Sequence, residues 1–183
     1  MDLETVTAEI TQVLITKEQI ETRIQELAKE IDAHYEKKDV LLVGVLKGAV
    51  MFMADLSRAV QSRVQMDWMA VSSYGSGTTS SGVVRILKDL DADVLGKDVL
   101  IVEDIIDSGL TLSWLVANLE ARGAASVEVV ALLRKPDAAK VDVDVRWVGF
   151  EIPNEFVVGY GLDYNERYRT LPGVAVLSPA VYS

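Results

Sequence analysis

Residues 99–111 read VLIVEDIIDSGLT, and this stretch carries the strongest structural signal in the chain. The continuous apolar run at 99–102 is typical of a strand that is covered on both faces of a parallel sheet. Glu103 and Asp104 close that run. The residues that follow predict a tight polar loop and then a helix over 111–122. We therefore expect a buried strand that delivers two carboxylates to a turn at a helix N-terminus.

The loop of this stretch has the chemistry of a phosphate cradle. Gly109 lets the backbone turn sharply, so that successive N–H groups point inward, and the helix N-terminus adds positive dipole. The hydroxyls of Ser108 and Thr111 add donors. Glu103 and Asp104 suit sugar hydroxyls, or a hydrated Mg²⁺ that a phosphorylated sugar holds. The alternative is an ordinary helix N-terminus that the Ser or Asp of the loop caps.

Strand and helix patterns alternate along the rest of the chain. Thr16 and Gln19 form a capping box that opens a helix, and an apolar stripe continues along it to Tyr35. Strands are expected over 40–45, 66–71, 83–87, 127–133 and 143–148, a second helix over 49–60, and a polar loop over 72–82. This order predicts an α/β fold with a mainly parallel twisted sheet flanked by helices, whose ligands bind beyond the carboxyl ends of the strands.

Length and composition limit the class of protein. A chain of 183 residues suits one domain, residues 1–183. The formal net charge of -10 argues against a general nucleic-acid binder, which needs a basic surface. The apolar run that stops at Lys47 is far shorter than the roughly 20 residues of a membrane-spanning helix. With no cysteine and no signal-peptide pattern, we expect a cytoplasmic protein without a membrane or nucleic-acid partner.

Residues 102–111 closely resemble the binding signature for phosphoribosyl pyrophosphate (PRPP) of type I phosphoribosyltransferases, and the Glu-Asp opening resembles the hypoxanthine-guanine branch. The other blocks of that branch follow in order: Leu46-Lys47-Gly48, Ser72-Ser73-Tyr74-Gly75, Leu133-Arg134-Lys135-Pro136 and the stretch 148–169. The resemblance covers about 15–177. It implies the type I phosphoribosyltransferase fold, with a small hood from the termini and a purine-binding segment at about 148–177.

The resemblance also implies an activity in purine salvage. The 5-phosphoribosyl group would move from PRPP to N9 of hypoxanthine or guanine, giving IMP or GMP and pyrophosphate. Asp107 would take the proton from purine N7 while N9 attacks the ribose C1. The PRPP loop as a whole would be Glu103, Asp104, Asp107, Ser108, Gly109, Leu110 and Thr111. Leu110 departs from relatives that have Lys there, so this loop must rely more on backbone amides.

The remaining blocks supply the rest of the implied site. Pyrophosphate would be bound by the backbone N–H groups of the loop with Lys47 and Gly48, which sometimes has a non-proline cis peptide, and by the planar fork of Arg169. Lys135 would donate to the purine 6-oxo oxygen, which disfavours adenine. The other purine-site residues would be Phe156 as a stacking platform, Val157 through its backbone, and Asp163.

A metal and a lid complete the implied enzyme. Mg²⁺ would be held by Glu103 and Asp104, with a second ion at Asp163. Ser73 and Tyr74 would lie in a mobile loop that closes over the reaction. The family usually forms homodimers or homotetramers. Two alternatives stay open: a regulator that binds PRPP only as a signal, and an enzyme for xanthine or a pyrimidine.

Overall fold

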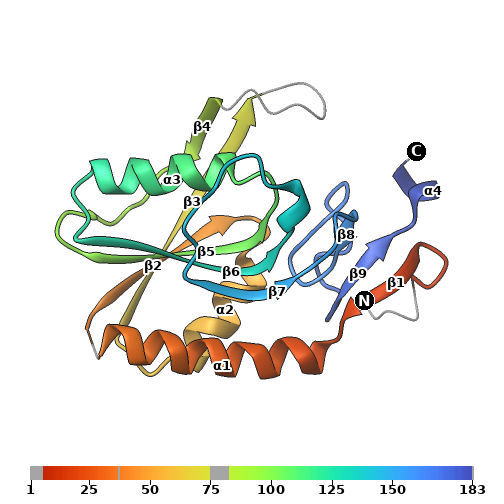
Figure 1. Cartoon of the computed structure of the whole chain (residues 1–183), viewed down its shortest axis with the longest axis horizontal. Helices are drawn as coiled ribbons and strands as arrows, with labels where there is room; N and C mark the ends of the chain where they lie inside the picture. Colours follow the sequence, from red (N-terminus) through yellow and green to blue (C-terminus); the bar gives the residue numbers. More distant parts are fainter. Residues whose placement is uncertain (1–5, 37, 75–82, 183) are drawn as a thin grey trace.

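A six-stranded sheet forms the centre of the computed structural model, which describes residues 6–36, 38–74 and 83–182. Its strand order is β4-β3-β2-β5-β6-β7 (Figure 1), and only the edge strand β4 is antiparallel to its neighbour. The mainly parallel sheet is therefore confirmed. The strands are β2 (Val40–Leu46), β3 (Val64–Tyr74), β4 (Val83–Lys88), β5 (Asp98–Ile106), β6 (Ser126–Arg134) and β7 (Trp147–Glu151).

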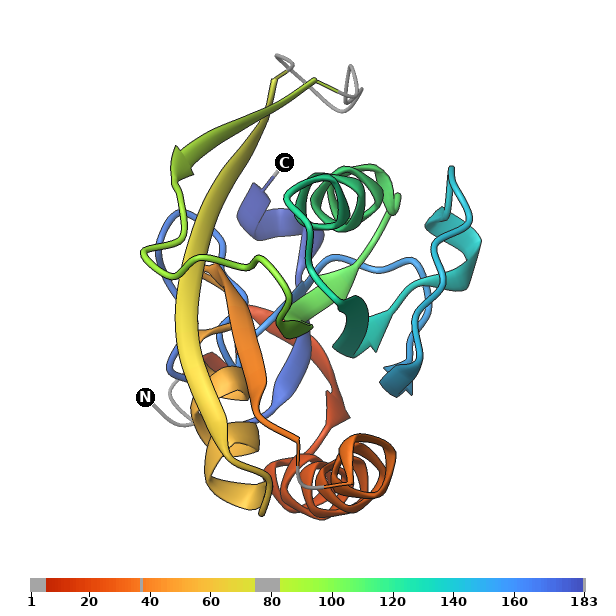
Figure 2. The ribbon, with the colours of Figure 1, turned by 90° about the vertical axis from the view of Figure 1, so that its left-hand side faces the viewer.

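Helices cover both faces of this sheet. Figures 1 and 2 show α1 (Lys17–Tyr35) and α2 (Val50–Ala59) on one face and α3 (Leu110–Ala121) on the other. The predicted capping box is present, because Thr16 accepts from the Gln19 backbone and the Gln19 side chain accepts from Thr16. The apolar stripe of α1 packs with Phe52 of α2 in one core cluster, and α3 packs in a second cluster on the opposite face.

Strand register brings the ends of the central strands to one edge. Gly44 of β2 pairs with Val102 of β5, and Ile106 of β5 pairs with Arg134 of β6. The loop after β2, the loop after β5 and Lys135 after β6 therefore all leave the sheet on the same side. This is the edge at which ligands bind in parallel sheets.

A small second sheet lies beside this edge. It contains β1 (Ile10–Ile15), β9 (Val174–Leu177) and β8 (Val157–Val158), in the order β1-β9-β8, and the short helix α4 (Pro179–Tyr182) follows it. Figure 1 shows this hood at the end of the large sheet, with both chain termini on it. The hood from the termini is as expected. Its segment begins later than predicted, because residues 148–151 lie in β7 of the large sheet.

The predicted strand over 143–148 is wrong for its first four residues. The alternation of valine and aspartate is typical of a strand, but β7 begins only at Trp147. Val143 and Val145 instead pack their side chains against the α3 core cluster. Just before them, Lys140 and Val141 donate backbone hydrogen bonds to the Ser108 carbonyl. This segment therefore packs over the loop after β5 and does not join the sheet.

Two further elements differ in extent. β5 continues to Ile106, so Glu103 and Asp104 lie inside the strand instead of after it. β3 continues to Tyr74, and Ser73 and Tyr74 pair through their backbones with β4. The side chains of Ser73 and Tyr74, and residues 75–82 of the expected lid, lie outside the described residues. No helix in the described part of the chain is long and apolar enough to cross a membrane.

Candidate active site

Three backbone segments meet at the carboxyl edge of the sheet, and two glycines allow their contact. A Cβ on Gly48 would lie 1.6 Å from Oδ2 of Asp104, and a Cβ on Gly161 would lie 1.9 Å from the Gly48 carbonyl oxygen. Gly161 also has φ +101, which favours glycine. Next to it, the Tyr160 hydroxyl donates to Oδ2 of Asp55 (2.5 Å), which ties this turn to α2. The loop after β2 is therefore held between β5 and the hood.

The loop after β5 lines a small pocket, as the cradle prediction requires. The pocket has a volume of about 110 Å³, and its walls include Glu103, Asp107, Ser108, Gly109 and Thr111. Gly109 has φ +79, and the backbone N–H groups of the first turn of α3 follow directly. The hydrogen bonds to the Ser108 carbonyl fix the outer side of the loop. The loop is thus a shaped hollow at a helix N-terminus, with Leu110 in the first turn.

The alternative that Asp107 caps α3 is wrong. The N-cap residue is Gly109, and the loop side chain that accepts a hydrogen bond at the helix start is Ser108, from the Leu110 N–H at 3.5 Å, not Asp107. The side chain of Asp107 is 62% exposed and lies 4.0 Å from Nζ of Lys135. A solvent-facing carboxylate that does not cap the following helix is available for chemistry.

Lys135 is a buried lysine, with 8% of its surface exposed. Its backbone N–H donates to the Ile106 carbonyl (2.9 Å), which holds the end of β6 against the end of β5. Burial orients the long side chain, so the ammonium group reaches Asp107 from the neighbouring strand end. Lys135 and Asp107 therefore present a donor and an acceptor side by side.

Glu103 and Asp104 form an acidic pair without a cationic partner. Burial raises the pKa of Glu103 well above its usual value, and the adjacent Asp104 adds to the rise. Burial also raises the pKa of Asp104, although Arg169 and the Ile105 backbone N–H act in the opposite sense. Neither carboxylate forms an ion pair within the described ranges, so the site favours a cation or hydroxyl groups from a ligand.

This acidic pair fits a hydrated Mg²⁺. The described residues contain no cluster of three or more metal-binding side chains. Mg²⁺ is usually held by one or two carboxylates and completes its shell with waters and substrate phosphates. Glu103 is buried and lines the hollow, and Asp104 follows it in the strand, so the pair matches that requirement.

Arg169 and Lys47 lie in one charged network. Nη2 of Arg169 is 2.9 Å from Oδ1 of Asp163, and Nη1 donates to the Gly161 carbonyl (2.8 Å). Glu166 joins the two cations, at 3.0 Å from Nζ of Lys47 and 3.2 Å from Nη2 of Arg169. The peptide bond between Leu46 and Lys47 is cis. The residues predicted to bind pyrophosphate therefore do lie together.

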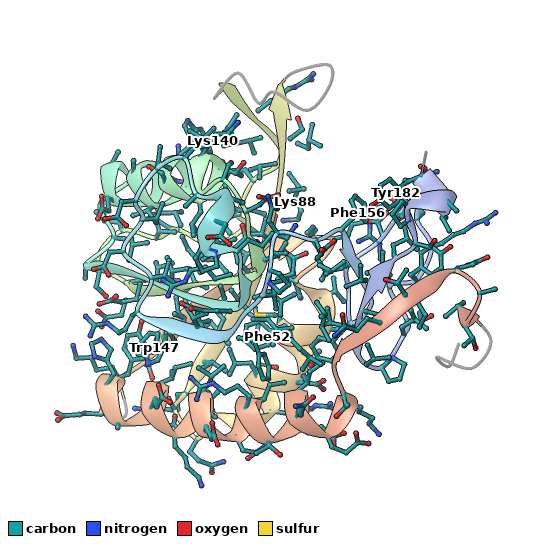
Figure 3. All side chains as sticks on the ribbon, turned by 45° about the vertical axis from the view of Figure 1, so that its right-hand side comes forward. Phe52, Lys88, Lys140, Trp147, Phe156 and Tyr182 are labelled. Atoms are coloured by element: carbon teal, nitrogen blue, oxygen red, sulfur yellow. The ribbon has the colours of Figure 1, made fainter. Side chains whose placement is uncertain are left out.

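Phe156 sits at the hood in an aromatic cluster. Its ring is 39% exposed and lies 5.0 Å from the ring of Tyr182 and 5.8 Å from that of Tyr164. Figure 3 shows Phe156 and Tyr182 next to each other at the end of the hood where α4 lies. The exposed ring is consistent with a platform and excludes the alternative that Phe156 is an ordinary core residue.

Val157 follows on the free edge of the small sheet. The Leu177 N–H donates to the Phe156 carbonyl, so the pair of Phe156 and Leu177 is the hydrogen-bonded kind. Hydrogen-bonded and non-hydrogen-bonded pairs alternate in antiparallel strands. The backbone groups of Val157 therefore point away from β9, and no strand formed by the described residues pairs with β8 on that side.

Sequence reasoning missed four residues of this region. Gly161, Tyr164 and Glu166 lie in the same C-terminal block as the predicted residues, but their partners are distant in the chain. Tyr182 lies beyond the stretch that resembles known blocks. The glycines on both sides of Tyr160, Gly159 and Gly161, were the one local signal in the sequence that an unusual turn was present.

Comparison with known proteins gives one consistent result. Residues 12–165 match the family model described as a phosphoribosyl transferase domain. The hypoxanthine-guanine phosphoribosyltransferase of Mycobacterium avium is 59% identical over 180 residues, which is 95% of this chain and 89% of that protein. The enzyme of the same name from Bacillus subtilis (strain 168) is 54% identical over 174 residues, 95% of this chain and 97% of that protein. A crystal structure of a hypoxanthine phosphoribosyltransferase from Staphylococcus aureus has a TM-score of 0.94 and 45% identity, and the match covers 98% of this chain and 97% of that one.

Proposed function

The chain belongs to the hypoxanthine-guanine phosphoribosyltransferase family, and on that premise we propose that it transfers the 5-phosphoribosyl group of PRPP to N9 of hypoxanthine or guanine. The products are IMP or GMP and pyrophosphate. In the transfer, the bond from ribose C1 to pyrophosphate breaks, a bond from N9 to C1 forms, and the N7 proton leaves the base. The residues at the sheet edge have a role for each of these changes.

One observation carries the assignment: the 4.0 Å separation of the Lys135 ammonium and the Asp107 carboxylate. The 6-oxo oxygen and N7 are neighbours on one edge of hypoxanthine and guanine. Lys135 donates to the oxygen while Asp107 accepts the N7 proton. Adenine carries an amino donor at position 6, so it would meet the ammonium donor and leave a buried group unpaired.

The rest of the base is held by the hood. Phe156 stacks on the purine ring, and the outward backbone groups of Val157 bond to its edge. Tyr164 contacts the Phe156 ring edge-on and Tyr182 lies against it, which limits the rotation of the platform. A rigid platform reduces the entropy that the site loses when the base binds.

The sugar phosphate occupies the loop after β5. Its 5-phosphate accepts hydrogen bonds from the N–H groups of the loop and from the Ser108 and Thr111 hydroxyls. Glu103 and Asp104 hold the ribose hydroxyls and a Mg²⁺ ion, and Asp163 holds a second one. When bound, Mg²⁺ offsets negative charge on the pyrophosphate leaving group. Lys47, the Gly48 backbone and Arg169 bind the pyrophosphate oxygens.

We also propose the setting in which the enzyme works. The two sheets act as one phosphoribosyltransferase domain, since the Gly161 turn of the hood is in contact with the loop after β2. Ser73 and Tyr74 begin a lid over the reacting groups. Chains of this family associate as homodimers or homotetramers in the cytoplasm, and the absence of cysteine suits a reducing compartment.

A base panel tests the proposal. Purified protein is mixed with PRPP, Mg²⁺ and one base, and nucleotide is measured by chromatography. We expect IMP from hypoxanthine and GMP from guanine, and at least tenfold lower kcat/KM for adenine and uracil. A site built to hydrogen-bond one polar group can reject an analogue that lacks it by about 10⁴-fold. Nucleotide from adenine, or from no base at all, contradicts the proposed function.

A further inference from the structure

Glu166 lies where two cations meet. Oε1 is 3.0 Å from Nζ of Lys47, and Oε2 is 3.2 Å from Nη2 and 3.4 Å from Nε of Arg169. Lys47 comes from the loop after β2, whereas Glu166 and Arg169 come from the C-terminal block. One carboxylate therefore spans the gap between two positive groups from separate parts of the fold.

Within this network, the ion pairs of Glu166 are the easiest to break. The side chains of Glu166 and Lys47 are both exposed, at 63% and 64%. Arg169 keeps two other acceptors that are less accessible, the Gly161 carbonyl and Asp163. Water can replace the contacts of an exposed carboxylate, so releasing Glu166 leaves no buried group without a partner.

Lys47 and Arg169 are also the cations that the proposed function gives to pyrophosphate. A carboxylate resembles part of a pyrophosphate in charge and in its oxygen acceptors, and both suit the planar fork of arginine. Two anions cannot hold the same faces of these cations at once. Glu166 and the pyrophosphate group therefore compete.

We propose that Glu166 is a built-in competitor: its carboxylate fills the pyrophosphate subsite between Lys47 and Arg169 and is displaced when PRPP or pyrophosphate binds. The inference rests on the proposed roles of Lys47 and Arg169. Its consequence is that Glu166 weakens the binding of pyrophosphate. The carboxylate returns to the cations as the product leaves, which speeds release.

Backbone geometry helps this return. Glu166 has φ +61, and its N–H donates to Oδ2 of Asp163 at 2.8 Å. The turn thus holds the backbone of Glu166 in place while the side chain moves. A competitor fixed by its own backbone is present at high effective concentration whenever the subsite empties.

Titration of inorganic pyrophosphate with Mg²⁺ into the whole protein, followed by calorimetry, tests the proposal. Glu166→Gln removes the charge and keeps the size. An exposed ion pair shifts an equilibrium by at most about fivefold, so the loss of two leads us to expect roughly three- to tenfold tighter binding. Glu120→Gln is the matched control, because Glu120 is exposed on α3 and changes the net charge equally. It should bind pyrophosphate as the wild type does.

Steady-state kinetics supply a second readout. The KM for PRPP should fall in Glu166→Gln by a similar factor, and the KM for hypoxanthine should stay unchanged. A purely structural role of Glu166 would not lower one KM selectively. Glu166→Asn provides a check on folding, because asparagine tolerates positive φ well and also removes the charge. It should give the same direction of change.

Arg169→Gln separates this inference from the proposed function. Weaker pyrophosphate binding in Arg169→Gln together with unchanged or weaker binding in Glu166→Gln overturns the competitor and leaves the pyrophosphate site intact. Unchanged binding in Arg169→Gln overturns the pyrophosphate site itself, and the competitor with it. Equal tightening in Glu166→Gln and Glu120→Gln would reduce the effect to net charge and also overturn the inference.

Discussion

Asp107→Asn separates chemistry from stability in this protein. The substitution keeps the size of the side chain but removes its ability to accept the N7 proton. A general base typically contributes about 10²–10⁴-fold to the rate, so the turnover number should decrease by a factor in that range. Binding of PRPP should persist, because the phosphate loop binds through its backbone and hydroxyl groups.

The structure predicts a small effect of this substitution on stability. Loss of a helix cap costs about 1 kcal/mol, which lowers Tm by roughly 2–4 °C in a protein of this size. Asp107 does not cap α3, so this cost is absent. The contact with Lys135 spans 4.0 Å and its Asp107 end is 62% exposed, so solvent screening limits its contribution to about 1 kcal/mol at most. The Tm of the mutant should therefore lie within about 2 °C of the wild type.

Thermal melting with and without PRPP and Mg²⁺, alongside steady-state kinetics, measures both effects. The mutant should melt as the wild type does, should still be stabilised by PRPP, and should turn over slowly. Near-normal turnover in Asp107→Asn would refute the assignment of the base. A Tm loss that accounts for the whole loss of activity would refute the claim that Asp107 has no structural role.

Three further predictions concern the other parts of the site. Lys135→Ala should lower kcat/KM for hypoxanthine by about 10- to 150-fold, the value of one hydrogen bond to a charged group, with little change in the KM for PRPP. Lys140→Ala is its control in the same loop, and equal losses for base and PRPP would contradict the assigned contact. Gly48→Ala should reduce the rise in Tm that PRPP gives, because the new Cβ would lie 1.6 Å from Oδ2 of Asp104. A misplacement of about 1 Å in a catalytic site can lower the rate about 10²-fold, so normal turnover in this variant would contradict the tight packing of the loop. Chelation of divalent ions should abolish turnover and Mg²⁺ should restore it, whereas full activity in excess chelator would exclude the proposed metal.

Local chemistry explains what could be predicted from the sequence. The strand at β5, its loop and α3 are encoded by neighbouring residues: an apolar run, a glycine at positive φ and a following helix. The α1 capping box is equally local. Asp107 and Lys135 were assigned to the site by the resemblance to phosphoribosyltransferases. Topology supports that assignment, because the carboxyl ends of parallel strands meet at one edge of the sheet.

Long-range packing explains what could not. The alternation that suggested a strand over 143–148 is a local signal, but contacts with Ser108 and the α3 core outweigh it. Tyr182 reaches Phe156 only because β9 and α4 return to the hood. Glu166 reaches Lys47 across 119 positions of sequence. No spacing in the sequence encodes such contacts, since they depend on how two sheets meet.

A crystal structure with hypoxanthine, Mg²⁺ and a non-reactive carbocyclic analogue of PRPP tests the central claim most directly. The claim is that Lys135 and Asp107 read one edge of a 6-oxopurine. We predict Nζ of Lys135 at hydrogen-bond distance from the 6-oxo oxygen and an Asp107 oxygen at hydrogen-bond distance from N7, both about 2.7–3.2 Å. Phe156 should lie against the ring, with N9 toward the sugar analogue. A base bound with its 6-oxo oxygen away from Lys135, or with N7 out of reach of Asp107, would contradict the account.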